Sequence, residues 1–372
     1  MLFVGAVVAG LVGTQVGAKS LATMFVCPVW FRGVGLYAIV FCSPWRTLAW
    51  RTLYDALCRL EGSELALLGR YPSWLGRWPA LVGFAVLVGV LENLTIVPRS
   101  PRATAAVVAG YGALILAGAV VFGRDWLDRA DALSVLYDLL GRVAPIRPRR
   151  TAAGGYRISL RAPWRGCARP IADFSLVTFA VAAVYTVSFD GFTSTPEFQR
   201  LLFDARAALG VGGGVSVLLY LLGLVGFVAV FVAISWVMGY IVGAEGRGDS
   251  HWRAFTLTFT PTVLPIATAY ELAHNYAYVL RNLALFVAQL ETAATGAVTG
   301  MGTAAEPVAL LGRLPVGAFW GSQVLLIVAG HVIAVVAAHR VALAVGETAS
   351  DARRIHAPLV ALMIGYTVLS YG

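Results

Sequence analysis

The stretch FWGSQVLLIVAGHVIAVVAAHR occupies residues 319–340 and decides the class of fold. A helix rises 1.5 Å per residue, so about 20 apolar residues are enough to cross the hydrocarbon core of a bilayer. A second stretch, PTVLPIATAYELAHNYAYVLRN at residues 261–282, is also long and apolar. Together they carry three of the five histidines. An ionisable side chain at membrane depth marks a candidate functional site.

The composition of the whole chain predicts the same class. Hydrophobic residues make up 59% of the 372 residues and charged residues 13%. A soluble domain has about 45–50% apolar and about 25% charged residues. We therefore expect an all-α integral membrane protein of a prokaryotic cell membrane, with the lipid bilayer as its main partner. Residues 1–372 would form one transmembrane domain, a bundle of about 8–9 spanning helices.

Apolar runs separated by polar or glycine-rich breaks define the predicted spans. The first run is shorter than a usual span, but no basic region precedes it, so it is interpreted as a span and not as a signal peptide. The seventh run contains Pro261 and Pro265, which should kink its helix. The predicted spans are residues 2–16, 21–41, 78–97, 103–122, 172–189, 211–244, 255–290, 316–345 and 357–371.

Two polar connections are expected to form structure at the membrane surface. Residues 43–77 hold five arginines and predict an amphipathic helix lying at the interface. Residues 124–171 predict a small basic cap. Its first part, residues 124–143, has apolar residues at helical spacing, and residues 156–160 alternate between apolar and polar side chains as a short strand does.

The distribution of basic residues predicts the orientation. The connections 43–77, 124–171, 244–254 and 340–356 hold 5, 10, 2 and 3 basic residues, whereas 98–102, 190–210 and 291–315 hold 2, 2 and 1. Cytoplasmic loops are enriched in Lys and Arg, and a basic face attracts anionic lipid. The N-terminus is therefore expected in the cytoplasm and the C-terminus outside. The net charge of +9 has no recognisable nucleic-acid-binding module beside it, so no nucleic acid is expected.

The intramembrane histidines are the first candidate site. His274 and His331 would both lie near mid-depth, and His339 nearer the inner end. Two imidazoles from facing helices could hold a haem iron or, with a carboxylate, a transition metal. Gln323 lies two turns before His331 and could bond a polar group or a water. The alternative is that each imidazole only hydrogen-bonds within the bundle, with Gly330 permitting close helix packing.

An acidic set toward the outer face is the second candidate site. Glu271 lies three residues before His274, on the same helical face, and could orient that histidine or relay protons. The alternative is that these residues are interfacial charges that cap helix ends. The set comprises Glu92, Asp190, Glu271 and Glu291, with Arg281 as the candidate counter-ion.

Several longer motifs carry a resemblance to a known family. They are SPWRTLAW (43–50), YPSWLGRWPALVGF (71–84), GRDWLDRADALSVLYDLLGRVAPI (123–146), SFDGF (188–192), AGHVIAVVAAHRVAL (329–343) and LMIGYTVLS (362–370). With these motifs the chain resembles a family of prokaryotic polytopic membrane proteins, some of which are labelled fenitrothion hydrolase, an organophosphate hydrolase. The resemblance implies a multi-span fold and supplies no catalytic residues.

Three functional classes follow from these observations. The first is a membrane-embedded metal- or haem-dependent enzyme or redox subunit that uses His274 and His331, and the sequence favours it narrowly. The second is a small-solute or ion transporter with a path lined by acidic residues and histidines, against which the chain shows no internal repeat and no matched pair of broken helices. The third is a non-catalytic subunit of a larger membrane complex.

Overall fold

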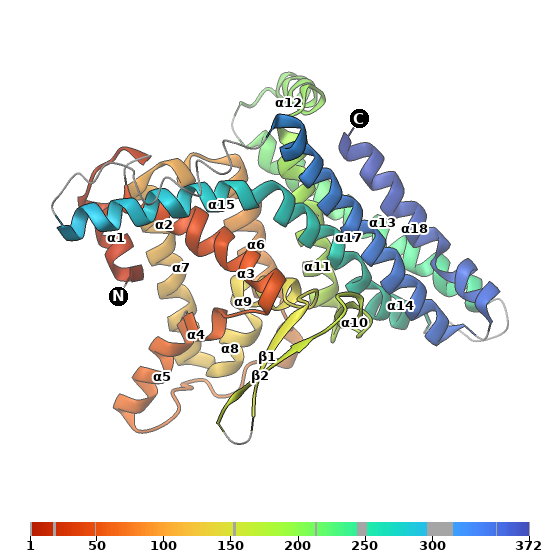
Figure 1. Ribbon diagram of the computed structural model, residues 1–372, viewed down its shortest axis with the longest axis horizontal. Coiled ribbons are helices and arrows are strands. Elements are labelled where there is room, and N and C mark those ends of the chain that lie inside the picture. The colour runs from red at the N-terminus through yellow and green to blue at the C-terminus, as the bar shows by residue number, and fades with distance from the viewer. Residues whose placement is uncertain are drawn as a thin grey trace.

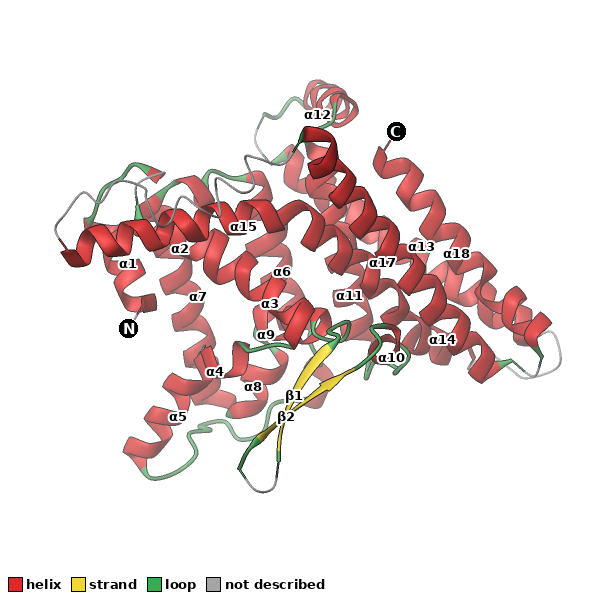
Figure 2. Ribbon diagram, viewed as in Figure 1, coloured by secondary structure: helices red, strands yellow, loops and turns green. Residues whose placement is uncertain are grey.

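The computed structural model describes residues 2–17, 20–48, 50–151, 154–212, 214–243, 251–295, 315–346 and 348–371. Most of these residues are helical, and the only strands among them form one hairpin (Figures 1 and 2). Buried apolar side chains from Val34 through Met363 form one continuous cluster between the helices. The helical fold predicted from composition is thus confirmed.

Six helical segments of the described chain are long and apolar enough to cross a membrane. They coincide with six of the predicted spans. The segments are Leu21–Phe41, Ser73–Glu92, Pro101–Phe122 (α7), Phe174–Thr193 (α11), Val215–Ile241 within α13 (Val215–Gly243), and Val316–Val345 (α17).

The other three predicted spans do not belong to this set of six. The first forms α1 (Leu2–Val12), whose 11 residues are too few to cross a bilayer. The last lies within α18 (Ala349–Tyr371). The seventh is divided into α14 (His251–Phe259), the 3₁₀ turn η6 (Thr260–Val263) and α15 (Leu264–Thr295).

The interruption of the seventh predicted span confirms the break expected at Pro261. Proline has no N–H, so the Leu257 carbonyl one turn earlier loses its helical donor. The backbone N–H of Ile171 donates to that carbonyl at 2.9 Å. The hydroxyl of Thr262 donates to the Phe259 carbonyl at 2.7 Å. A buried backbone carbonyl needs such a partner, and the break is therefore stabilised by neighbouring groups.

Two of these six candidate spans contain a π-helical stretch. Leu21–Phe41 consists of α2 (Leu21–Phe25), η2 (Val26–Gly33) and α3 (Val34–Phe41), and Pro28 lies inside η2. Ser73–Glu92 consists of η3 (Ser73–Leu75), α6 (Trp78–Phe84) and η4 (Ala85–Glu92). A π-helical stretch widens the helix, displaces side chains from α-helical positions, and occurs frequently at functional sites.

Short elements gather at one end of the bundle, at the bottom of Figure 1. Residues 124–143 do not form the single helix that was predicted, because Asp131 caps a second helix by accepting a hydrogen bond from the Leu133 N–H. Residues 43–77 likewise divide. The helices of this end are α4 (Trp45–Leu48), α5 (Trp50–Glu61), α8 (Arg124–Arg129), α9 (Ala132–Leu140) and α10 (Trp164–Cys167).

A β-hairpin projects from the same end. The predicted strand is confirmed as β2 (Tyr156–Leu160) and pairs antiparallel with β1 (Ile146–Arg150), with Ile146 opposite Leu160. The sequence of β1 is IRPRR, a strand that was not predicted. Its Pro148 is tolerated because a strand of a two-stranded sheet has one unpaired edge.

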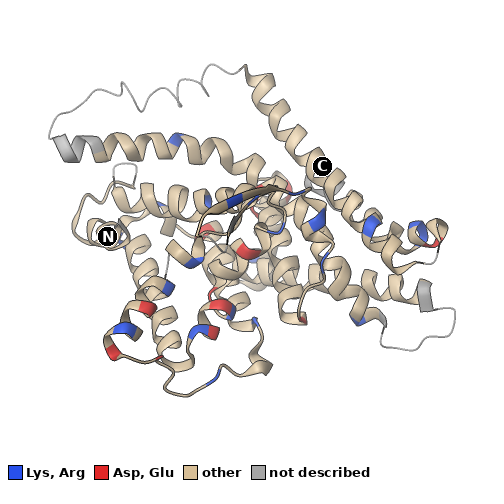
Figure 3. Cartoon of the chain, turned by 60° about the horizontal axis from the view of Figure 1, so that its bottom comes forward, with Lys and Arg blue, Asp and Glu red and all other residues tan. Residues whose placement is uncertain are grey.

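The opposite end carries α12 (Pro196–Leu209) and the last turn of α18, at the top of Figure 1. The short 3₁₀ turn η5 (Val97–Arg99) precedes α7. Figure 3 turns the bottom end toward the viewer and shows basic and acidic residues interspersed on its short helices, while the long helices are mostly without charge. The connections 43–77 and 124–171 therefore lie at the end opposite to α12, as predicted. That the bottom end is cytoplasmic stays a prediction.

Candidate functional site

An ion-paired cluster joins three helices inside the bundle. Arg32 lies on η2, Glu92 is the last residue of η4, and Glu271 lies in α15. Their side chains are 11%, 17% and 9% exposed, respectively. We call these three residues the Arg32 cluster. Arg32 and Glu92 fall within the π-helical stretches, so the local widening of each helix helps to bring their side chains together.

The two carboxylates bind Arg32 differently. Glu271 uses both oxygens on one nitrogen: Arg32 Nη1 donates to its Oε1 at 3.0 Å and to its Oε2 at 2.8 Å. Glu92 uses one oxygen: its Oε1 lies 2.9 Å from Arg32 Nε and 2.7 Å from Nη2. The second oxygen, Oε2, is buried and accepts no hydrogen bond from a residue that the structure describes. Each carboxylate therefore makes two charge-assisted contacts with Arg32, and Glu92 alone keeps an oxygen that Arg32 does not bind.

The charges of the Arg32 cluster do not balance, because two carboxylates share one guanidinium. An uncompensated charge away from water is costly, and it favours a proton or another cation nearby.

A first cavity borders Arg32 and Glu271. It encloses about 630 Å³ of empty space, counted to its open mouth, and Asp190 and His274 lie on its wall. Both side chains are exposed. Further polar wall residues are Asn93, Tyr137, Thr186 and Asn275. Three members of the predicted acidic set, Glu92, Asp190 and Glu271, thus lie around Arg32 and this cavity. The side chain of Glu291 lies outside the described residues.

A second cavity borders Glu92. It contains about 690 Å³ of empty space, counted to its open mouth, and has a mostly apolar wall that includes six aromatic residues. Phe31 and Val88 line both cavities, so the two spaces are neighbours. The cluster therefore faces a polar cavity through Glu271 and an apolar cavity through Glu92. The aromatic wall residues of the second cavity are Phe3, Trp30, Phe31, Trp45, Trp50 and Tyr111.

The helices that carry His274 and His331 pack together, as predicted. A Cβ at Gly330 would lie 2.3 Å from the Cβ of Ala269 and 2.7 Å from the carbonyl oxygen of Pro265, so only glycine permits this contact. The Tyr270 ring lies 5.7 Å from the His274 ring and 6.3 Å from the His331 ring. His274 lines the first cavity and His331 does not. That the two histidines share one pocket stays a prediction.

Each of the two histidines also contacts its own helix. Nδ1 of His274 lies 3.0 Å from the Tyr270 carbonyl oxygen, and Nδ1 of His331 lies 2.8 Å from that of Ile327. A partner within the same helix was not expected from the sequence, but the carbonyl four residues earlier supplies one. Within the described ranges, no group of three His, Cys, Asp or Glu side chains could hold a metal ion. The transition-metal site that the sequence favoured is therefore not supported among these residues.

The remaining candidates lie elsewhere. His339 packs against His356 of α18 with ring centroids 5.0 Å apart. Gln323 is half-buried, and no hydrogen bond joins it to a described residue. The polar contact between α15 and α17 is made instead by Ser322 and Tyr276, whose hydroxyls lie 2.8 Å apart.

The predicted counter-ion is also corrected. Arg281 is exposed on α15 and forms no ion pair with any acidic residue in the described segments. Arg32 has that role instead. The sequence could have indicated Arg32, because an arginine within a predicted span needs a carboxylate partner from another helix. The sequence did not indicate which carboxylate.

A separate buried carboxylate, Asp131, holds the helices beside the second cavity. It accepts hydrogen bonds from Trp45 Nε1 at 2.7 Å, the Tyr111 hydroxyl at 2.5 Å and the Leu133 N–H at 3.0 Å. Burial raises the pKa of Asp131, and these donors oppose that shift. All three donors are neutral, in contrast with Arg32.

A scan against protein-family models, a search of curated proteins and a search of solved structures each found no match. The interpretation of the site rests on its geometry.

Proposed function

We propose that the protein is a membrane transporter for small cationic solutes, and that the Arg32 cluster couples solute binding to proton binding. One observation carries this proposal: a buried guanidinium is shared by two carboxylates from different helices, between a polar and an apolar cavity. An excess carboxylate at membrane depth is a site that one cation at a time can neutralise.

Glu92 is the carboxylate that would exchange partners. Glu271 uses both oxygens on Arg32, whereas Glu92 uses one and borders the apolar cavity. A proton or a solute cation on Glu92 would leave the pair Arg32–Glu271 intact and remove the excess negative charge. The proton and the solute would therefore compete for the same group.

The cavity walls indicate the class of solute. The second cavity combines aromatic rings with a carboxylate, and aromatic faces attract cations. An amine or quaternary ammonium ion with an apolar body would match both features.

The helix interruptions favour transport over the other classes. The sequence argument against a transporter was the lack of an internal repeat and of a matched pair of broken helices, whereas in the described chain η2, η4 and η6 each interrupt a long helical segment. Irregular helices at membrane depth line the sites of many transporters. Membership of the family with fenitrothion hydrolase labels remains a proposal and entails only the multi-span fold. A role as an accessory subunit would predict no transport by the isolated protein.

The proposal is tested in liposomes that contain the purified protein and a pH gradient. We expect ethidium, an aromatic cation, to accumulate against its gradient and to dissipate the pH gradient as it does so. Glu92→Gln should lower this exchange at least tenfold, whereas Glu64→Gln should not change it, since the Glu64 side chain is 56% exposed and remote from both cavities. Equal rates for the wild type and Glu92→Gln would refute the coupling role of Glu92.

A further inference from the structure

A third cavity opens among the short helices of the end that carries the β-hairpin. It contains about 810 Å³ of empty space and is lined by four arginines and three aspartates. We call it the arginine pocket. The arginines come from four different segments of the chain and are Arg46, Arg77, Arg129 and Arg142.

Two of the three wall aspartates are already ion-paired. Asp138 lies 3.1 Å from Arg46, and Asp128 lies 3.3 Å from Arg51, which is outside the wall. Asp125 is only within 4.0 Å of Arg129, the outer limit of an ion pair, and it is 58% exposed. Little carboxylate charge is therefore left for the other arginines of the wall.

Arg142 is bound by neutral groups. It donates to the carbonyl oxygens of Arg169 at 2.8 Å and Pro170 at 3.4 Å, and it forms no ion pair with a carboxylate of the described chain. Burial lowers the pKa of Arg142, and nearby arginines, Arg77 among them, lower it further. Positive charge thus accumulates around Arg142.

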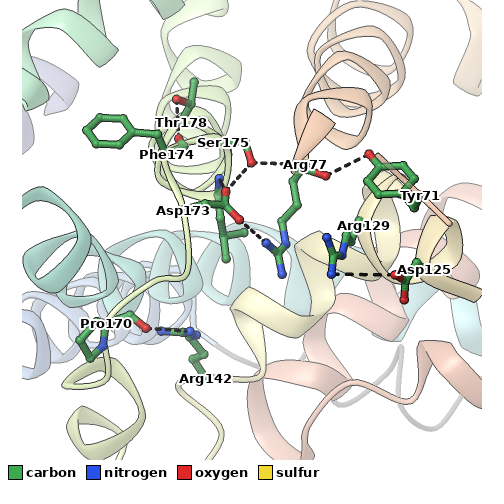
Figure 4. Close-up of polar contacts among 12 residues, drawn as sticks. Tyr71, Arg77, Asp125, Arg129, Arg142, Pro170, Asp173, Phe174, Ser175 and Thr178 are labelled. Carbon is green, nitrogen blue, oxygen red and sulfur yellow. Dashed lines mark hydrogen bonds and ion pairs between the residues drawn. The ribbon is translucent and has the colours of Figure 1, made fainter. Parts of the chain in front are cut away.

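Figure 4 shows how three of these arginines lie. Arg77 bonds Asp173 at 2.6 Å, and its guanidinium lies next to that of Arg129 in this view, while Arg142 lies lower and bonds the Pro170 carbonyl. Each guanidinium presents several N–H donors in one plane, which suits the oxygens of a phosphate group.

The surroundings place the arginine pocket at the depth of lipid headgroups. Arg77 lies between Trp74 and Trp78, which are 78% and 44% exposed, at the start of the spanning segment Ser73–Glu92. Leu67 and Leu68, nearby in the chain, are each 73% exposed. Exposed tryptophans at the end of a span are typical of the membrane–water interface.

We propose that the arginine pocket binds a phosphate group, carried by an anionic phospholipid of the adjacent leaflet or free in solution. Arg129 and Arg142 would contact its oxygens, because neither is held by a close carboxylate. The exposed indoles and leucines beside the pocket favour the lipid as the source. This inference does not depend on transport, since it concerns a separate cavity.

The test uses the purified full chain in detergent and counts bound phosphatidylglycerol by native mass spectrometry, with phosphatidylcholine as the zwitterionic control lipid. Each arginine near a membrane surface contributes about fivefold to binding of anionic lipid. We therefore expect Arg129→Gln to reduce the preference for phosphatidylglycerol about fivefold and Arg129→Lys to reduce it less. Arg59→Gln removes the same charge from an exposed position outside the wall, and it should leave the preference unchanged.

A second arm distinguishes the two sources. Inorganic phosphate at millimolar concentration should displace little phosphatidylglycerol if the lipid is the ligand. Binding of inorganic phosphate that needs Arg129 and is unaffected by the lipid would assign the arginine pocket to a soluble phosphate. An equal effect of Arg129→Gln and Arg59→Gln in both arms would overturn the proposal.

Discussion

The Arg32 cluster and the arginine pocket both combine arginines with carboxylates, but carboxylates outnumber arginines in the first and arginines outnumber carboxylates in the second. In the Arg32 cluster two carboxylates share one guanidinium, and all three side chains are less than one-fifth exposed. In the arginine pocket four guanidiniums face three aspartates, two of which are already paired. A surplus carboxylate inside the bundle attracts a cation, and surplus arginines at the interface attract an anion. The depth and the sign of the surplus together indicate the class of ligand.

The largest effect is expected from removing the charge of Arg32. Arg32→Met leaves two adjacent carboxylates without a counter-ion, and breaking a buried pair costs about 3–5 kcal/mol in the free energy of unfolding. Arg124→Gln removes an arginine that is 52% exposed and paired with Asp55 at 3.1 Å, and it should cost at most about 1 kcal/mol. Chemical denaturation in detergent measures both values.

The charge argument for Arg32 has its own control. If the loss comes from unpaired carboxylates, adding Glu92→Gln and Glu271→Gln to Arg32→Met should restore most of the stability. A triple variant that is no more stable than Arg32→Met would show that packing, and not charge, explains the effect.

The next effect separates the two carboxylates of the cluster. Each carboxylate makes two charge-assisted contacts with Arg32, but only Glu92 also buries an oxygen that accepts no hydrogen bond from a described residue, so Glu271→Gln should lower the free energy of unfolding more than Glu92→Gln does. Glu92→Gln should instead have the larger effect on cation exchange. The opposite order in both measurements would show that Glu271 exchanges partners and that Glu92 anchors Arg32.

A third buried carboxylate sharpens the comparison, because only neutral groups bind it. The pKa of Asp131 is raised by burial, so the folded state holds its proton more tightly than the unfolded state does. The free energy of unfolding should therefore fall as the pH rises from about 3.9, the ordinary value, through the raised pKa. Asp131→Asn should flatten this dependence, and an unchanged pH profile of unfolding would contradict it.

The sequence predicted the helical fold and six of the spans because apolar length is a local property. It could not predict which carboxylate binds Arg32. That choice depends on two π-helical stretches and on the packing of three helices. No periodic pattern in the sequence marks either feature. The histidines were overvalued for a related reason. Their spacing indicates depth, whereas Tyr270, which contacts both rings, is placed by tertiary packing.

The smallest expected effect on folding is that of Arg129→Gln, and this result would complete the comparison. Its only carboxylate partner within the described ranges is Asp125 at 4.0 Å, and its side chain is 38% exposed, so the loss in the free energy of unfolding should stay below about 1 kcal/mol. That value should also decrease when salt is added, because exposed charges are screened. A loss as large as that of Arg32→Met would mean that Arg129 is a structural ion pair of the folded bundle. Its surplus charge would then no longer be available for an anion, and the contrast between the two regions would disappear.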